Sequence, residues 1–375
     1  MRTLVISDLH IGAASGADLL RRPDLREPLM AAVGEVDRLV ILGDAVELRD
    51  SPQRGVAEVA GPFFSELGEA LGADGELVLV PGNHDHGLVA GWIDGRLQTE
   101  ASGFLGLEQR VEPADAGRLA AVLAERAAPA RVSVAYPGLW LRDDVYALHG
   151  HYSDVHTTVP TFERLASGVM ARFAAPLPDE GATPDDYEAI LAPLYAWIHA
   201  VAQRAGDDSV VAAGAGASAR AWVALAGGPN GGRRPLRSLA LGAGYVSAVG
   251  VINLAGLGPI SRDLSGASLR RGGLRGIGEV LRRLGVTAPH VVWGHSHRSG
   301  PHPADDLREW TAPTGSRIHN TGSWVYQRHF LTGAPNESPY WPGTAVEVDD
   351  DGRPPRLRRL LGDRGHEVLS APRPG

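Results

Sequence analysis

A short apolar run that ends in a polar loop recurs in the first part of this sequence, and this repetition constrains the fold more than any other feature. The runs cover residues 4–6, 39–42 and 77–80, and each is followed within three residues by an aspartate or an asparagine. Short apolar runs with polar boundaries are typical of buried strands. Helix-like stretches at about 24–36 and 55–72 separate the runs. This alternation predicts an α/β fold with functional groups at the carboxyl ends of the strands.

The same pattern returns later in the chain after a long interruption. A helical segment is predicted at about 113–126. Further strands are predicted near residues 131–135, 144–148, 290–293, 317–321 and 344–348. We therefore predict one split domain, residues 1–156 and 281–350. An insertion at 157–280 interrupts it, and a peripheral tail follows at 351–375.

The predicted insertion is apolar and helical in character. It contains helix-length apolar stretches near 186–204, 208–227 and 238–261, and the last of these carries no charged side chain. That length is enough to cross a bilayer, but a single crossing would place the polar loops on opposite sides of a membrane. Three interpretations stay open: a buried hairpin of core helices, contact with lipid or acyl chains, and a spanning hairpin.

Composition excludes several kinds of chemistry and partner. The sequence has no cysteine, which excludes disulfides, thiolate metal sites and cysteine nucleophiles. Its 44 acidic and 36 basic residues give a net charge of −8, so no nucleic-acid partner is expected. The first residues do not resemble a signal peptide, because Asp8 follows an apolar run of only a few residues. We expect a cytoplasmic protein, with residues 157–280 as a candidate contact with the inner face of a membrane.

Five short motifs at predicted strand ends carry the candidate chemistry. They are Asp8-Leu9-His10, Gly43-Asp44, Gly82-Asn83-His84-Asp85, His149-Gly150-His151 and Gly294-His295-Ser296-His297. In an extended segment, residues two apart point the same way, so a motif can present two ligands to one cavity. Glycine precedes three of the candidate ligands, where we expect the backbone to turn sharply. Carboxylate, amide and imidazole ligands without thiolate suit Mn, Fe or Zn, and a set this large suits two divalent ions that share a carboxylate.

This ordered set of motifs resembles the calcineurin-like metallophosphoesterase superfamily. The resemblance covers roughly residues 1–156 and 285–325. It implies a four-layer metallophosphoesterase fold, a two-sheet β-sandwich flanked by helices, here with a large helical insertion. It also implies an enzyme that uses a metal-bridging hydroxide to hydrolyse a phosphate ester or pyrophosphate bond.

The resemblance assigns a role to each motif residue. The first metal would be held by Asp8, His10 and His297, the second by Asn83, His149 and His295, with Asp44 shared between them. His84 would protonate the leaving oxygen, and Asp85 would orient His84 by a hydrogen bond. The second motif departs from the family pattern, because Glu47 stands where many members have aspartate and Leu48 replaces the usual arginine.

Two further histidines are candidate substrate contacts. His151 is predicted either to reach substrate or to lie on the surface. His86 is predicted either to line the cleft or to be solvated in a loop.

Within the superfamily, the residues around the second and fourth motifs most resemble the branch of the UDP-2,3-diacylglucosamine pyrophosphohydrolases. The resemblance implies a phosphorylated small-molecule or lipid substrate, either lipidic or nucleotide-linked. Two alternatives are a soluble phosphomonoesterase or cyclic-nucleotide phosphodiesterase with the insertion as a lid, and a DNA-processing nuclease. The negative net charge argues against the nuclease alternative, although arginines cluster between residues 262 and 283. A binding module without metals would show eroded ligands, and all five motifs here are complete.

Overall fold

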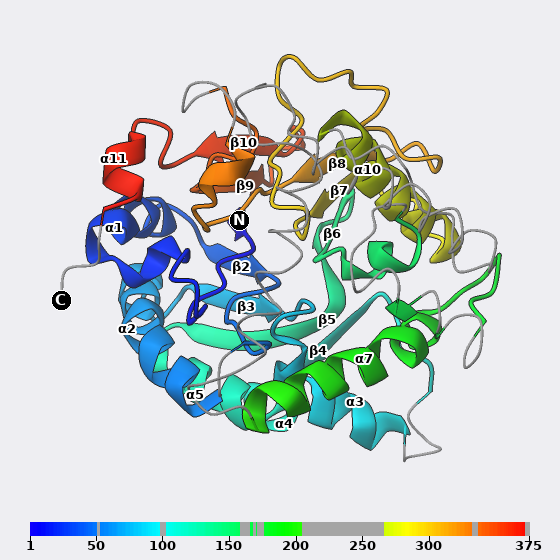
Figure 1. Cartoon of the computed structure of the whole chain (residues 1–375), viewed down its shortest axis with the longest axis horizontal. Coiled ribbons are helices and arrows are strands. Elements are labelled where there is room, and N and C mark those ends of the chain that lie inside the picture. Colours follow the sequence, from blue (N-terminus) through cyan, green and yellow to red (C-terminus); the bar gives the residue numbers. More distant parts are fainter. Residues whose placement is uncertain are drawn as a thin grey trace, which may run out of the picture.

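A computed structural model describes residues 1–50, 53–97, 103–157, 166–167, 170, 176–204, 266–331 and 337–371 (Figure 1). The apolar stretches predicted at 208–227 and 238–261 lie outside the described residues. No helix of the described ranges is both long enough and apolar enough to cross a membrane.

The strands form one hydrogen-bonded path, in which the long strand β5 (Arg131–Arg142) joins two halves. The order along the path is β10 (Arg356–Arg359), β9 (Thr344–Asp349), β1 (Arg2–Ile6), β2 (Arg38–Leu42), β3 (Glu76–Val80), β5, β6 (Val145–Leu148), β7 (His290–Trp293) and β8 (Arg317–Asn320). A further strand, β4 (Glu108–Val111), pairs with β5. The first part of β5 pairs in parallel with β3 and its second part pairs antiparallel with β6. The single strand β5 therefore belongs to both halves of the sheet system.

Helices cover the outer faces of both halves (Figure 1). They are α1 (Pro23–Val33), α2 (Gln53–Leu71), α3 (Ala90–Leu97), α4 (Pro113–Ala116), α5 (Arg118–Arg126), α7 (Pro184–Arg204), α10 (Gly266–Arg283) and α11 (His366–Leu369). Short 3-10 turns η1 (Leu19–Arg21), η2 (His86–Leu88), η4 (His151–Val155) and η5 (Arg328–Phe330) connect them. Within the described residues, the predicted helices and strands occur where the sequence predicts them, with boundaries that shift by a few residues except at β5, which continues well past its predicted end. The sequence analysis did not predict α3, α10, α11, β4 and β10.

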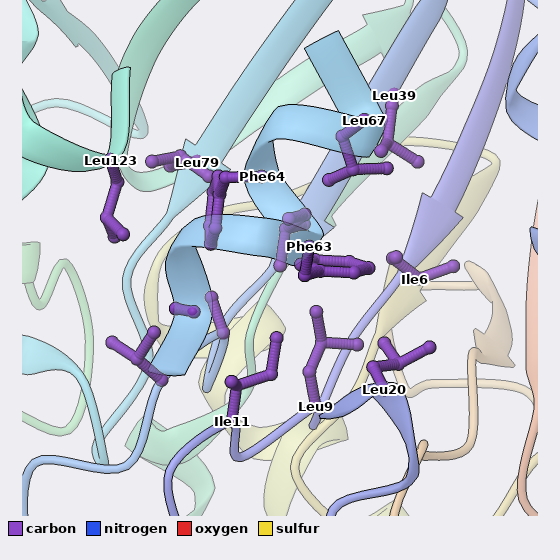
Figure 2. Close-up of a cluster of buried hydrophobic side chains, with 14 of the residues drawn as sticks. Ile6, Leu9, Ile11, Leu20, Leu39, Phe63, Phe64, Leu67, Leu79 and Leu123 are labelled. Atoms are coloured by element: carbon purple, nitrogen blue, oxygen red, sulfur yellow. The ribbon is translucent and has the colours of Figure 1, made fainter. Parts of the chain in front are cut away.

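Three hydrophobic clusters show that these elements form four layers. Side chains of β1–β3 alternate: Leu4 and Ile6 face the α1–α2–α5 layer, whereas Val5 faces the other half of the sheet system. Figure 2 shows the first cluster, in which Phe63 and Phe64 of α2 pack on the strands. A second cluster joins β6–β8 to α7 and α10, and a third lies between the two halves. This arrangement confirms the expected metallophosphoesterase fold.

The described parts of the predicted insertion and tail pack against the main fold. Tyr187 and Ile190 of α7 are fully buried in the second cluster. Residues 351–371 add the edge strand β10, and Leu361 and Leu369 are buried in the first cluster. The division of the chain into a split domain, an insertion and a tail stays a prediction.

Candidate metal centre

The predicted motif loops meet at the carboxyl ends of β1, β2, β3, β6 and β7, as expected for parallel strands of an α/β fold. Three groups of side chains lie there, and within each group the candidate ligand atoms are all within 4.8 Å of one another. The groups are Asp8, His10 and His297; His10, Asp44 and His84; and Asp44, His149 and His295. Because neighbouring groups share a member, they form one continuous candidate metal centre.

Asp8 is fully buried, and only one of its carboxylate oxygens accepts hydrogen bonds. Oδ2 accepts them from the Ser7 hydroxyl and from the backbone N–H of His295, at 2.9 Å for the latter. Oδ1 accepts none and lies 3.2 Å from Nε2 of His297 and 4.0 Å from Nε2 of His10. Burial opposes ionisation of Asp8, but His297 lowers its pKa below the ordinary value. A buried charged oxygen without a donor is costly unless a cation faces it, so Oδ1 fits a metal ligand.

Asp44 lies between the two sides of the centre. Its Oδ1 accepts a hydrogen bond of 2.8 Å from the backbone N–H of His84. Its Oδ2 lies 3.6 Å from Nε2 of His10 and 3.3 Å from Nε2 of His149. Burial would raise the pKa of Asp44, but the surrounding histidines hold it well below its ordinary value. A charged oxygen in this position can be shared by two metal ions.

His149 is fully buried, and its two ring nitrogens have different partners. Nδ1 lies 2.9 Å from the carbonyl oxygen of Leu42, so Nδ1 carries the proton and donates it. Nε2 lies 3.2 Å from the side-chain oxygen of Asn83. The Leu42 carbonyl therefore leaves Nε2 as the nitrogen that can bind a metal.

His10 is held in the same way by a carboxylate. Its Nδ1 lies 3.1 Å from Oε2 of Glu47, and its Nε2 lies 3.2 Å from Nε2 of His297. Burial disfavours the charged ring, but Glu47, Asp44 and Asp8 together raise the pKa of His10 to about 9. The position attracts positive charge, which a divalent ion bound at Nε2 can supply in place of the proton.

Five non-glycine residues of the described chain have a left-handed backbone with positive φ, and all five belong to the candidate metal centre. They are Asp8 (55°), His10 (46°), Asp44 (54°), His295 (62°) and His297 (57°). Such conformations cost of order 1–3 kcal/mol each and concentrate at functional sites. The extended geometry expected for the first and last motifs is therefore wrong, although Asp8 and His10 still belong to one group. His295 and His297 face different groups, because the chain turns at each of them.

The glycines of the motifs are required mainly by close packing. Gly43 has the left-handed φ (+89°) that a sharp turn requires. Gly82 and Gly294 do not have a positive φ, but a Cβ on Gly82 would lie 2.4 Å from Oδ1 of Asp44, and one on Gly294 would lie 2.3 Å from the Ser7 hydroxyl oxygen. The chain does bend directly after Gly82 and Gly294, at Asn83 and His295, but only Gly43 needs the conformational freedom of glycine for its turn.

His84 belongs to the second group, and 27% of its side chain is exposed. Its Nδ1 lies 2.7 Å from Oε2 of Glu47, and its Nε2 lies 3.3 Å from a guanidinium nitrogen of Arg49. Burial lowers the pKa of His84, although Glu47 and Asp44 act in the opposite direction. A neutral ring with its proton on Nδ1 accounts for both contacts, because Nε2 then accepts from Arg49.

Asp85 does not orient His84, and that expectation is corrected. Its carboxylate accepts hydrogen bonds from the backbone N–H groups of Gly82 (2.6 Å), Ala45 (2.7 Å) and Asp44 (3.2 Å). Burial and the nearby charge of Asp44 raise the pKa of Asp85 to about 6. Asp85 therefore fixes the main chain, and it is Glu47 that contacts His84.

The two histidines expected to contact substrate lie in a second buried cluster. Glu188 of α7 lies 2.9 Å from Nε2 of His86 and accepts hydrogen bonds from the hydroxyls of Tyr136 and Tyr152. Nε2 of His151 lies 3.5 Å from the Tyr136 hydroxyl. We call these five residues the Glu188 cluster. His86 and His151 are only 4% and 2% exposed, so the expectation of a solvated loop position for His86 and of a surface position for His151 is wrong. Contact of either residue with substrate stays a prediction.

The sequence analysis did not assign a role to four residues that contact the motif side chains or the residues next to them. They are Glu47, Arg49, Asp154 and Glu188. Glu47 could have been found, because it occupies the position where many family members have aspartate. Glu188 is 102 residues away from His86 along the chain, so no local pattern links the two.

The donor set fits divalent metal ions. Carboxylate oxygens, an amide oxygen and imidazole nitrogens converge, with Asp8 Oδ1 and several Nε2 atoms directed towards one another. Ions such as Mn, Fe or Zn take this combination of ligands.

Comparisons with known proteins bear on this centre. Among solved structures, the chain is similar to a dimetal phosphatase from Danio rerio, with 10% identity, a TM-score of 0.34, and coverage of 95% of this chain and 98% of that one. A search of curated proteins finds no match. The model of the calcineurin-like phosphoesterase family matches residues 1–299, which is most of the chain. The chain therefore belongs to the calcineurin-like phosphoesterase family and is a metallophosphoesterase.

Proposed function

We propose that this protein hydrolyses a phosphate ester or pyrophosphate with two divalent metal ions held at the candidate metal centre. The first ion would be held by Asp8, His10 and His297, the second by Asn83, His149 and His295, and Asp44 would be shared. The observation that carries this proposal is the position of Asp44 Oδ2, 3.6 Å from one imidazole Nε2 and 3.3 Å from another on the opposite side. A single shared oxygen explains why the groups overlap.

The chain's own residues would position the substrate and supply a proton. When bound, two divalent ions activate water and neutralise charge on phosphoryl oxygens. We assign the role of general acid to His84, with the proton delivered from Nε2 to the leaving oxygen. The hydrogen bond from Nδ1 to Glu47 fixes the ring orientation that this transfer needs. A phosphate next to Nε2 would favour the protonated ring, because negative charge raises an imidazole pKa.

Arg49 is the residue that we assign to the substrate phosphate. Leu48, at the position where the family usually has arginine, is 1% exposed and packs in the first hydrophobic cluster. The guanidinium of Arg49, one residue later, lies against Nε2 of His84. A planar cation beside the general acid suits recognition of phosphoryl oxygens.

For the substrate, we propose a lipidic or nucleotide-linked phosphate ester or pyrophosphate, with peripheral membrane contact through residues 157–280. The resemblance to the diacylglucosamine pyrophosphohydrolase branch and the uncharged stretch 238–261 support this choice. The nuclease alternative gains no support from α10, since Arg270 pairs with Glu309 and Arg282 and Arg283 both pair with Glu279.

Metal analysis of the purified full-length chain, combined with a substrate panel, tests the proposal. The panel contains p-nitrophenyl phosphate, its bis ester and a UDP-linked lipid pyrophosphate, each with and without detergent. We expect two divalent ions per chain, activity that a chelator abolishes, and a preference for the lipid pyrophosphate. One ion or none per fully active chain contradicts the two-metal site. A preference for the simple esters, with all protein left in the supernatant after sedimentation with liposomes, contradicts the lipidic substrate.

A further inference from the structure

We propose that Asp154 is a positioning residue for the second metal. By accepting a hydrogen bond from Nε2 of His295, Asp154 fixes the ring tautomer that leaves Nδ1 as the nitrogen with a free lone pair. This inference rests on the proposed two-metal function. It adds a carboxylate that none of the motifs contains.

The contact between the two side chains is short and sheltered. Oδ1 of Asp154 lies 2.9 Å from Nε2 of His295, and the two side chains are 9% and 17% exposed. The other oxygen of Asp154, Oδ2, is buried and has no hydrogen-bond partner. In the described part of the chain, His295 is the ion-pair partner found for Asp154, with no arginine beside it. A carboxylate with this single partner has little reason to be buried except to act on the imidazole.

The backbone around Asp154 is held in place by close packing. Asp154 lies in η4, which begins directly after the left-handed Gly150. A Cβ on Gly150 would lie 2.7 Å from the ring of Trp293, and a Cβ on Gly276 of α10 would lie 3.1 Å from the carbonyl oxygen of Ser153. The two glycines therefore let η4 press against β7 and α10. This packing fixes the carboxylate relative to His295.

Two of the other three candidate histidine ligands show the same arrangement. His10 directs Nδ1 to the carboxylate of Glu47, and His149 directs Nδ1 to the carbonyl of Leu42. Histidines that bind metals generally donate their second ring N–H to such an acceptor, and this partner orients the ring and makes the ligand nitrogen more basic. Asp154 supplies this acceptor for His295, but on Nε2 instead of Nδ1.

Titration of the metal-free full-length protein with Mn²⁺ in a calorimeter tests the inference. We expect Asp154→Asn to keep the Kd for the first equivalent of Mn²⁺ within about twofold of wild type. The Kd for the second equivalent should rise about 10–100-fold, the usual effect of losing such a partner. Asp305→Asn is the matched control, because Asp305 is 8% exposed, follows the last motif and pairs with Arg298 rather than with a candidate ligand. We expect the control to bind both equivalents as wild type does.

A second pair of variants separates positioning from a general structural effect. In a His295→Ala background, Asp154→Asn should change the affinity for the second Mn²⁺ by less than about twofold, because the residue through which it acts is gone. Equal weakening in both backgrounds, or wild-type affinity in Asp154→Asn itself, overturns the inference. Thermal unfolding of each variant checks the fold, and a wild-type protein that binds fewer than two ions contradicts the proposed function instead.

Discussion

Two buried polar clusters adjoin at His149 and His151, and they differ in which of their atoms are left unpaired. In the candidate metal centre, Asp8 Oδ1 has no hydrogen-bond donor, imidazole Nε2 atoms face one another, and five ligand residues have left-handed backbones. In the Glu188 cluster, the carboxylate contacts the His86 imidazole and accepts hydrogen bonds from two tyrosine hydroxyls, whereas Nδ1 of His151 has no hydrogen-bond partner. None of its members is among the residues with strained backbone. The rings of His149 and His151, one from each cluster, are only 5.6 Å apart.

This difference teaches how to recognise a site among buried polar residues. Both clusters contain histidines and carboxylates, so residue type and burial do not separate them. An unpaired carboxylate oxygen and backbone strain do, because both are stable only if something else compensates for their cost. We infer that the first cluster is built to bind ions, whereas the second fastens α7 to the loop that carries the catalytic motif.

The largest effect is expected at the shared carboxylate of the candidate metal centre. Asp44→Asn removes the charge that lies between the two imidazoles, so we expect turnover below detection and loss of at least one bound metal ion per chain. Activity assays and metal analysis of the purified variant measure this. Asp306→Asn, at an exposed aspartate that pairs with Arg308, is the control. Wild-type activity in Asp44→Asn contradicts the shared role.

The next largest effect separates proton transfer from metal binding. His84→Ala should lower kcat by roughly 10²–10⁴-fold, the usual range for loss of a general acid, with both metals retained. The measurement is kcat for a substrate with a poor leaving group, together with the metal content. The loss should be much smaller for p-nitrophenyl phosphate, whose leaving group needs no proton. An equal loss on both substrates rules out the acid role.

A smaller effect is expected for the cation beside His84. Removing a charge-assisted hydrogen bond to phosphate costs about 1.5–3 kcal/mol, so Arg49→Ala should raise KM roughly 10–100-fold. Steady-state kinetics of Arg49→Ala and of Arg308→Ala, which alters an arginine with 91% of its side chain exposed, make the comparison. An unchanged KM in Arg49→Ala would show that the phosphate binds elsewhere.

Substitution in the Glu188 cluster should lower the stability of the protein but leave metal binding and activity unchanged. Glu188→Ala leaves buried His86 without its carboxylate, and breaking such a pair costs about 3–5 kcal/mol of folding free energy. Chemical denaturation should show this loss, whereas the metal content and kcat of the folded fraction should stay close to wild type. Loss of metal from a folded Glu188→Ala protein would mean that the two clusters are coupled.

The smallest effect is a change in how stability depends on pH. Burial alone would raise the pKa of Glu188, but the His86 imidazole and the tyrosine hydroxyls lower it below the ordinary 4.5. The unfolded chain therefore takes up the proton first as pH falls, so this stabilisation is complete above pH 4.5 and declines below it. The free energy of unfolding of Glu188→Gln should thus fall less steeply than that of wild type below pH 4.5. If the free energy of unfolding falls equally steeply with pH in the two proteins, the pairing of Glu188 with His86 is contradicted.

Much of the fold and most of the centre could be predicted from the sequence, because both depend on local patterns. Apolar runs such as 39–42 and 77–80 form buried strands, and parallel strands place their carboxyl ends at one edge. Asp44 and Asn83 therefore come together without any knowledge of packing. The long strand β5 could not be predicted in full, since its second part is defined by pairing with β6.

The partners of the motif side chains were decided by tertiary structure alone. Sequence proximity suggested that Asp85 orients His84, but the left-handed and tightly packed loops direct Asp85 to the main chain and bring Glu47 to His84. His86 and Asp154 likewise have partners more than 100 residues away along the chain. The motifs determined which atoms are available, because residue type and strand ends are local properties. Packing between layers determined which of these atoms meet, since side-chain direction depends on contacts that no short segment contains.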